Sequence, residues 1–334
     1  MSEKHPIVAV TGSSGAGTTT VRHAFQDIFR REKICAAFVE GEAFMRYERD
    51  EANRLIQQAQ AQGKTLSLFG PEMHELERLE SLFKKYAEHG TGEVRDYVME
   101  DNQAQLGLAL GTFTPWQTLP SNTDLLFYEG LHGGVMAREW TRRKMSPSHN
   151  PIVIERRKAA EKNPGVDVAQ HVDLLIGVVP VVSLEWIQKI HRDTNVRGQT
   201  PEAVTNTILR RLHDYTQCIT PQFSFTDINF QRVPIVDTSN PFIARDVPTA
   251  DESVVVIRFR EPARFNFPGL MRRIKNSYMS RPNTMVIPGG KMQLALEIIC
   301  TPLIHELLEK KTKKPGGVET LKVSGAPARW LRPD

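Results

Sequence analysis

The sequence predicts an α/β protein built on a mainly parallel sheet with helices on both faces. Short apolar runs alternate with amphipathic segments of helical period along most of the chain. The run at 172–182, VDLLIGVVPVV, is almost wholly apolar, which is typical of a strand covered on both faces. A glycine-rich turn joins the first apolar run to the first amphipathic segment, as in many strand-to-helix connections of such sheets.

The first half of the chain predicts three strands and three helices. In the first helix, the apolar residues Val21, Phe25, Ile28 and Phe29 share one face. Residues 91–120 are rich in Gly, Thr and Pro and are expected to be irregular. In chain order the expected elements are a strand at 6–11, a helix at 19–32, a strand at 35–41, two helices within 50–90 and a strand that ends at Glu129.

The second half continues the alternation. We expect the strands after residue 225 to be partly antiparallel, and Pro302 to kink or interrupt the last helix. The whole of 1–311 is expected to form a single domain with a basic, solvated insertion at about 137–168, followed by a flexible basic tail at 312–334. The expected elements are a strand at 172–182, helices at 183–193 and 200–219, strands at 228–238, 252–260 and 283–290, and a helix at 291–311.

Composition and charge indicate a globular protein with an anionic ligand. The chain has 334 residues, of which 40% are hydrophobic and 25% charged, and a formal net charge of +4. Its Lys and Arg residues are spread along the chain, so we expect no nucleic-acid partner. The three widely spaced cysteines, the lack of a signal peptide and the lack of a long apolar run predict a cytoplasmic protein with no membrane partner.

The glycine-rich turn resembles a phosphate-binding loop without its lysine. Gly12 and Gly17 occupy the glycine positions of G-x-x-x-x-G-K-[ST], Thr18 stands at the lysine position and Thr19 at the Ser/Thr position. Backbone N–H groups of such a loop bind phosphate oxygens, with help from the helix dipole. The alternative is a plain turn that uses glycine for conformational freedom. The expected ATP-binding residues are Gly12, Ser13, Ser14, Gly15, Ala16, Gly17, Thr18, Thr19 and Thr20.

Acidic residues end two of the predicted strands. Glu129 follows an apolar run and, with the Thr19 hydroxyl, is expected to hold Mg²⁺. Glu40 and Glu42 follow the second strand, where α/β sheets place their ligands. A carboxylate there can accept a proton from a substrate hydroxyl as it attacks a phosphate. A solvated acid at a strand end is the alternative.

The helix at 183–193 concentrates charged residues on one face. Glu185, Lys189, Arg192 and Asp193 are spaced at i, i+4, i+7 and i+8. The helix follows a buried strand and so begins at the same sheet edge as the loop, which makes Lys189 a candidate for the charge missing at Thr18. The alternative is an exposed salt-bridge stripe.

Three arginines lie beyond this face. Arg197 follows within a turn of the helix end, and the pair Arg210 and Arg211 is suited to bidentate phosphate binding. Adjacent helical residues point in different directions, so we expect one of the pair to act.

At these residues the sequence resembles the bacterial phosphoribulokinases, and most of all the shorter phosphoribulokinase-like proteins of bacteria that lack carbon fixation. The resemblance covers nearly the whole chain except the insertion and the tail. It implies a P-loop NTPase fold similar to nucleoside monophosphate kinases and related to uridine kinase. It also implies transfer of the ATP γ-phosphoryl group to the 1-hydroxyl of ribulose 5-phosphate with Mg²⁺. The segments that carry it are VTGSSGAGTTT, LLFYEGLHGG, VVPVVSLEWIQKIHRD, TPQFSFTDINFQRVPIVDTSNPFIAR and DESVVVIRFR.

The resemblance assigns roles to several residues. Bacterial members share the loop without lysine, so Thr18 is a family trait. Lys189 is implied to serve the phosphates, Glu129 the metal site, and Asp193 to be an essential carboxylate. A homo-oligomer is implied as well. The residues implied to bind the sugar phosphate are Arg49, Arg192, Arg197, Arg210 and Arg211. Those implied to bind NADH, an activator of bacterial members, are Arg31, Arg258 and Arg281.

Two positions depart from the family pattern. The family reads Glu-Gly-Asp followed by Ala-Phe-His-Arg, whereas this chain reads EGEAFMRY. Glu42 thus replaces the proposed catalytic base, and Met45 replaces a histidine on the substrate side. Glutamate keeps the acid, while methionine carries neither charge nor a hydrogen-bond donor. The sequence therefore leaves open a kinase for another sugar phosphate or hydroxyl acceptor, and a nucleotide-sensing regulatory protein with little catalysis.

Overall fold

The computed structural model describes residues 5–13, 18–99, 103, 107–136, 165–179, 181–195, 197–243 and 246–312. Most of the expected insertion at 137–168 and almost all of the expected tail at 312–334 lie outside these residues. The last residues of the expected insertion are described, and Val168 is fully buried beside the sheet. Val168 therefore belongs to the core, whereas Gly165 at the start of this stretch is exposed.

Most strands of the described chain form one eight-stranded sheet. The strands are β1 (Ile7–Gly12), β2 (Ala36–Glu40), β5 (Leu125–Gly130), β6 (Leu174–Val179), β7 (Ile228–Pro234), β8 (Ser253–Phe259), β9 (Tyr278–Arg281) and β10 (Thr284–Pro288), while β3 (Glu93–Val94) and β4 (Gln117–Thr118) pair separately. The order in the sheet is β2–β5–β1–β6–β7–β8–β10–β9. The first five run parallel and the last three pair antiparallel, as the sequence predicts.

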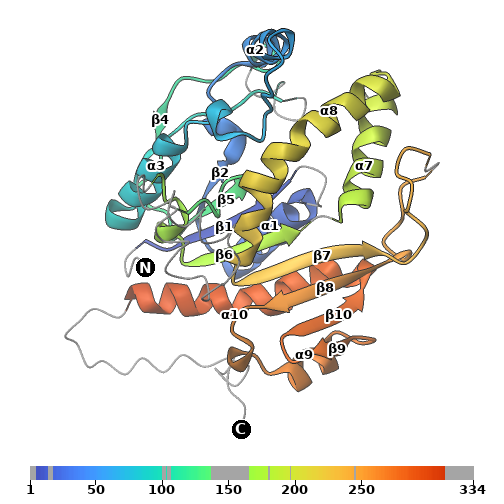
Figure 1. Ribbon diagram of the computed structural model, residues 1–334. Helices are drawn as coiled ribbons and strands as arrows, with labels where there is room; N and C mark the ends of the chain where they lie inside the picture. Colours follow the sequence, from blue (N-terminus) through green and yellow to red (C-terminus); the bar gives the residue numbers. More distant parts are fainter. Residues whose placement is uncertain are drawn as a thin grey trace, which may run out of the picture.

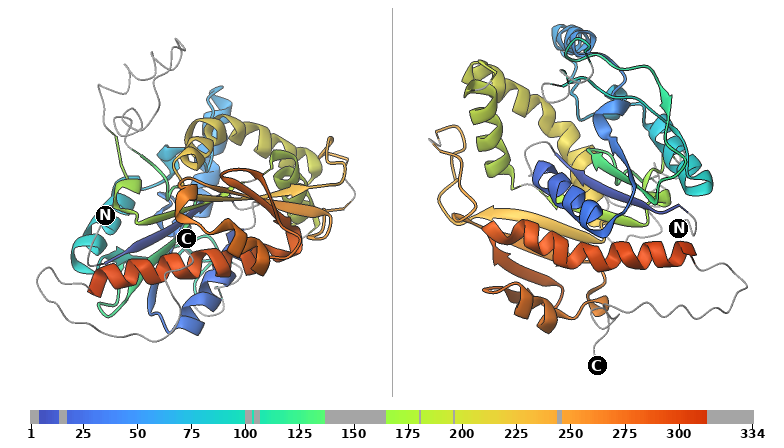
Figure 2. Two further views of the ribbon diagram at one scale, coloured as in Figure 1. Left: turned by 90° about the horizontal axis from the view of Figure 1, so that it is seen from below. Right: turned by 180° about the vertical axis from the view of Figure 1, so that it is seen from behind.

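Helices cover both faces of this sheet (Figures 1 and 2). Helices α1 and α10 lie along one face, while α3, α7 and α8 lie on the other side of the sheet. The helices are α1 (Thr18–Glu32), α2 (Arg49–Ala61), α3 (Leu76–His89), α7 (Val182–Asn195), α8 (Pro201–Asp214), α9 (Phe267–Arg273) and α10 (Met292–Thr312). This arrangement confirms the predicted α/β class.

Side chains of β1 point alternately to the two faces of the sheet and contribute to the apolar core on each face. Val8 and Val10 pack toward α1 and α10, whereas Ile7 and Ala9 pack toward α3, because successive strand side chains point to opposite faces. All four are fully buried. The predicted apolar face of α1 also faces the core, since none of its four members is more than 3% exposed.

Pro302 does not interrupt the last helix, so the expected interruption does not occur. Helix α10 continues from Met292 to Thr312 with Pro302 inside it. The apolar side chains Leu296, Ile299 and Leu303 are buried against the sheet on both sides of the proline in sequence. We attribute the continuous helix to this packing, which offsets the one backbone hydrogen bond that proline removes.

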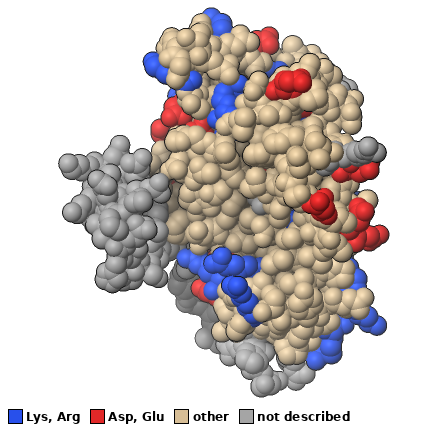
Figure 3. Space-filling model, turned by 45° about the vertical axis from the view of Figure 1, so that its right-hand side comes forward, with Lys and Arg blue, Asp and Glu red and all other residues tan. Residues whose placement is uncertain are grey.

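Charged side chains are distributed over the surface in separate groups. On the face seen in Figure 3, Lys and Arg gather near the top and near the base of the molecule, with a largely uncharged area between them. None of the helices in the described part of the chain is both long and apolar enough to cross a membrane.

The ends of β2 and β5 approach closely at two glycines. A Cβ on Gly130 would lie 2.5 Å from the Tyr128 hydroxyl and 2.7 Å from Cα of Gly41. Tyr128 is only 1% exposed and Gly41 presents backbone, so neither neighbour can move aside cheaply. Glycine is therefore required by space at this edge of the sheet.

We expect Gly130→Ala to lower the free energy of unfolding by about 1–3 kcal/mol, the usual cost of overpacking a core. Chemical denaturation measures this change. Gly290→Ala is the matched control, because a Cβ there meets only Asp251 at 3.5 Å. Equal stabilities of the two variants would contradict the steric argument.

Candidate active site

The start of the phosphate loop lies at the carboxyl edge of the parallel strands. Gly12 ends β1, and Ser13 is fully buried after it. Thr18, Thr19 and Thr20 form the first turn of α1. The remaining predicted ATP-binding residues, Ser14, Gly15, Ala16 and Gly17, lie outside the described residues. The strand before and the helix after the loop are both present, as the motif requires.

Three glutamates lie at the ends of β2 and β5. Glu40 and Glu129 are paired residues of these parallel strands, and Arg22 of α1 forms an ion pair with Glu40 at 2.5 Å. Glu42 follows in the short 3₁₀ turn Gly41–Phe44. Burial, together with the charges of Glu40 and Glu129, raises the pKa of Glu42 to about 7. A carboxyl group with a raised pKa is well suited to exchange a proton near neutral pH.

Oxygen donors of this kind fit Mg²⁺. Among the described residues, no three His, Cys, Asp or Glu side chains converge as a ready-made metal site. Mg²⁺ at phosphate sites is held by one or two carboxylates together with phosphate oxygens and water. Glu129 is a carboxylate at the expected place, and a cation beside it would favour the ionised form of Glu42.

Arg95 holds the turn that carries Glu42. Its guanidinium donates hydrogen bonds to the carbonyls of Ala43 at 2.9 Å and Met45 at 2.6 Å. The same group stacks on Phe113 at 3.5 Å and on Trp116 at 4.6 Å, measured to the ring centroids. The position of Glu42 therefore depends on a residue far along the chain, for which the sequence offers no motif.

Asp193 is the centre of a charge cluster on α7. Its side chain is 2% exposed and forms ion pairs with Lys189, with Arg192 at 3.1 Å and with Arg197 at 3.1 Å. Burial opposes ionisation, but the hydrogen bond from Lys189 and the nearby positive charges hold the pKa of Asp193 below its usual value. The predicted charged face is thus a connected cluster, with the residues grouped as the helical spacing suggests.

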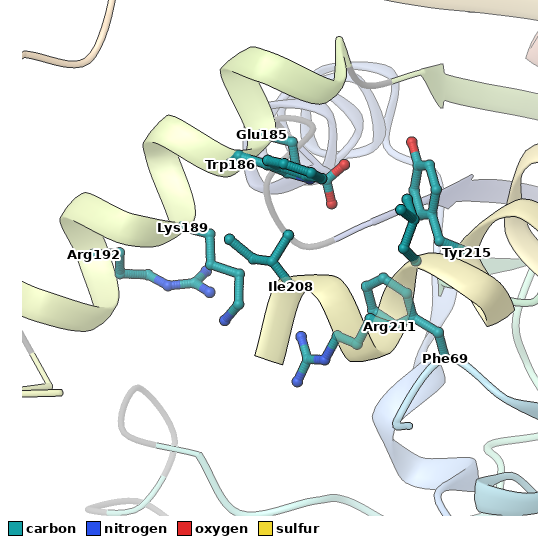
Figure 4. A pocket seen from close by; sticks show the side chains of 9 residues that line it. Phe69, Glu185, Trp186, Lys189, Arg192, Ile208, Arg211 and Tyr215 are labelled. Atoms are coloured by element: carbon teal, nitrogen blue, oxygen red, sulfur yellow. The ribbon is translucent and has the colours of Figure 1, made fainter. Parts of the chain in front are cut away.

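A pocket between α7 and α8 gathers the positive charges (Figure 4). The charged ends of Lys189, Arg192 and Arg211 point into the same space, which Phe69 and Trp186 line with aromatic rings. Burial and the neighbouring charge lower the pKa of Lys189, and burial lowers that of Arg211 to about 10. An anion in this pocket would lower the cost of keeping these groups charged.

Other predicted residues lie elsewhere in the structure. Arg49 begins α2, where its N–H donates to the carbonyl of Gly111. Arg210 donates to Thr207 at 3.4 Å, and its Nε atom is buried without a hydrogen-bond partner. Arg211, adjacent to Arg210 on α8, lines the pocket.

The three predicted effector arginines do not meet within one chain. Arg258 and Arg281 are both exposed and both pair in register with Thr284, one on each side of β10. Arg31 instead contacts Glu297 of α10 at 2.7 Å. The neighbours of Arg258 on β8, Ile257 and Phe259, face α10, so Arg258 leaves the strand on the opposite face from Arg31.

A buried pair of histidines, His74 and His132, connects the segment after Glu42 with the segment after Glu129. His74 pairs through its backbone with Met45, which is 9% exposed, and its ring lies edge-on to that of His132, with the centroids 4.3 Å apart. Burial lowers the pKa of His74 to about 4, and burial together with the neighbouring His74 lowers that of His132 well below the usual value. Both ring nitrogens of His132 are buried, and neither has a hydrogen-bond partner among the described residues. No local pattern in the sequence marks this pair.

We expect the pair to make the protein sensitive to acid. The unfolded chain binds these protons near pH 6.5, whereas in the folded chain His74 binds its proton only near pH 4 and the pKa of His132 is also well below its usual value. Stability is therefore lost as pH falls below about 6.5. The loss should reach about 1.4 kcal/mol per pH unit for each imidazole. His132→Phe should flatten the slope seen in urea unfolding at pH 7, 6 and 5. The exposed His213→Phe is the control, and identical slopes for the two variants would contradict this account.

Together, the strand-loop-helix at the sheet edge, the acids on β2 and β5 and the cationic pocket define a P-loop kinase. The chain belongs to the phosphoribulokinase/uridine kinase family, whose model matches residues 7–239. It is therefore a phosphotransferase that uses ATP and Mg²⁺ and a hydroxyl acceptor.

Named relatives are similar over almost their whole length. Phosphoribulokinase of Sinorhizobium medicae (strain WSM419) is 52% identical over 312 residues, which are 93% of this chain and 99% of the relative. A probable phosphoribulokinase of Escherichia coli (strain K12) is 49% identical over 312 residues, with the same coverage of both chains. The solved structure of phosphoribulokinase from Rhodobacter spheroides is 50% identical, with a TM-score of 0.79 over 93% of this chain and all of that one.

Proposed function

We propose that this protein transfers the γ-phosphoryl group of ATP to the 1-hydroxyl of D-ribulose 5-phosphate, giving ribulose 1,5-bisphosphate. The observation that carries the proposal is the pocket of Lys189, Arg192 and Arg211 beside Asp193, at the edge of the sheet where the phosphate loop starts. Both substrates are phosphorylated, so their approach requires positive charge that the loop without lysine does not supply. The similarity to named phosphoribulokinases supports the choice of acceptor.

In this reaction Glu42 acts as the general base. Its carboxylate accepts the proton of the 1-hydroxyl as that oxygen attacks the γ-phosphorus. Lys189 and the arginines of the pocket neutralise the negative charge on the phosphoryl oxygens in the transition state. Asp193 assists by holding Lys189, Arg192 and Arg197 in position through its ion pairs.

Thr19 and Glu129 are the proposed holders of the metal. When bound, Mg²⁺ supplies charge neutralisation at the β- and γ-phosphate oxygens of ATP. We propose that the phosphate of the sugar is bound by Arg49, Arg192, Arg197, Arg210 and Arg211. The buried, unpartnered Nε of Arg210 supports a role for it in anion binding, because such a group otherwise carries an uncompensated cost.

We further propose that NADH activates the enzyme through Arg31, Arg258 and Arg281. Because Arg31 and Arg258 lie on opposite faces of the sheet, a single site that uses all three arginines requires two copies of the chain. This supports the proposed homo-oligomer. We also propose that the enzyme acts in the cytoplasm, which suits a kinase that depends on ATP and NADH.

The test is ADP release by the purified protein with Mg-ATP and ribulose 5-phosphate, with and without NADH. We expect turnover that requires the sugar. Lys189→Ala and Asp193→Ala should each lower kcat about 10²–10³-fold, because each removes charge that acts on the transition state or positions such charge. Lys84→Ala, which removes an exposed lysine on α3, is the matched control.

Two results would overturn the proposal. ATP binding without turnover of any pentulose phosphate would point to a nucleotide-sensing protein. Faster turnover of ribulose 5-phosphate after combining Met45→His with Glu42→Asp would point to a site tuned to a different acceptor.

For the effector, Arg281→Ala should abolish any stimulation by NADH while leaving the basal rate unchanged.

A further inference from the structure

Glu185 connects α7 to the start of the phosphate loop. The hydroxyl of Ser13 donates a hydrogen bond to Oε1 of Glu185 at 2.5 Å. Ser13 is fully buried and comes directly after Gly12, the last residue of β1. The bond therefore joins two segments that are 172 residues apart in sequence, at the point where the loop leaves the sheet.

A second hydroxyl lies beside the same carboxylate. Tyr215, which follows the last residue of α8, interacts with Glu185, and this interaction lowers the pKa of Glu185. Figure 4 shows Glu185 and Tyr215 on facing sides of the pocket, with Lys189 one turn further along α7. Glu185 thus brings together the end of β1, helix α7 and the turn after α8.

An acid is unexpected in a pocket that binds phosphates. Its negative charge repels a phosphate group, so it opposes the attraction of Lys189 and Arg211. Burial also opposes ionisation and raises the pKa of Glu185, whereas the Ser13 bond and the charges of Arg211 and Lys189 act in the other direction. Glu185 therefore does not serve to attract phosphate. Its contacts with Ser13 and Tyr215 indicate that it holds helix α7 in position.

Helical geometry connects Glu185 to the reacting groups. Lys189 and Asp193 follow it at i+4 and i+8, so all three lie along one face of the same rigid helix. Fixing Glu185 against Ser13 fixes both the rotation of α7 and its distance from β1. The ammonium group of Lys189 then has a defined position relative to the loop.

We propose that Glu185 is a positioning residue that fastens α7 to Ser13 and so aims Lys189 at the phosphoryl group being transferred. The inference rests on the proposed function for the identity of the phosphoryl group. The hydrogen bond between Ser13 and Glu185 does not depend on that function. Lys189 on α7 can replace the loop lysine only if α7 keeps a fixed position relative to the start of the loop. The bond of Glu185 to Ser13 provides that fixed position.

The test compares Glu185→Gln, Glu185→Ala, Ser13→Ala and the double variant Ser13→Ala/Glu185→Ala, with the exposed Glu202→Gln on α8 as the matched control. Glutamine keeps an oxygen that accepts the Ser13 bond but carries no charge. We expect Glu185→Ala to lower kcat about 10–100-fold, the usual result of misplacing a reacting group by about 1 Å. The Kd for Mg-ATP should change less than about threefold, and Glu185→Gln should retain most of the activity.

Two outcomes in the kinetics would overturn the proposal. Equal losses in Glu185→Gln and Glu185→Ala would mean that the charge acts directly. Fully additive losses in the double variant would mean that Ser13 and Glu185 act independently.

Hydrogen exchange separates this inference from the proposed function. Without any substrate, amides of residues 182–195 should exchange at least tenfold faster in Glu185→Ala and Ser13→Ala than in the native protein. Amides of α3 and the Glu202→Gln control should be unchanged. Unchanged exchange in α7 would refute the fastening even if the enzyme is active. Absence of sugar-dependent turnover in the native protein would refute the proposed function and leave the exchange result to decide the fastening.

Discussion

The parallel pairing of β2, β5, β1 and β6 is the constraint on which the rest of the structure depends. Parallel strands place their carboxyl ends at one edge of the sheet, and ligands of open α/β sheets bind beyond that edge. Here the edge receives the phosphate loop from β1, the glutamates from β2 and β5, and helix α7 after β6. Four segments from different parts of the sequence therefore meet at this edge.

Two acids of the site, Asp193 and Glu42, differ in the charges that surround them. Asp193 is surrounded by cations and stays ionised, so it organises positive charge on α7. Burial, together with the nearby carboxylates, raises the pKa of Glu42 and so favours its protonated form in the absence of a cation. The two environments push the pKa values of the two carboxyl groups apart, which is how one site can contain both a fixed anion and a proton acceptor.

Sequence periodicity predicted those features that depend on neighbours within one element. The face of α7 with Lys189 and Asp193, the apolar face of α1 and the acid at the end of β5 belong to this group. The contacts of Arg95 with the Glu42 turn, the His74–His132 pair and the Ser13–Glu185 bond could not be predicted. Each joins residues at least 50 positions apart, and nothing in either local sequence identifies its partner.

The same limitation applies to Pro302 and to the effector arginines. Proline lowers the helix propensity at position 302, but packing of α10 against the sheet decides the outcome. The local sequence around Arg31 and Arg258 does not predict the face of the sheet on which each lies, because that depends on strand register and on where α10 lies.

The place of α10 in the chain has a consequence for how the protein is made. This helix covers the apolar face of the parallel strands and of the antiparallel strands alike, yet it is the last described element to be synthesised. Until residues 292–312 leave the ribosome, side chains such as Val8, Ile176 and Ile257 have no cover from it. The nascent chain therefore carries an exposed apolar surface for most of its synthesis, and the final core assembles at the end, which is the stage at which chaperones can assist such chains.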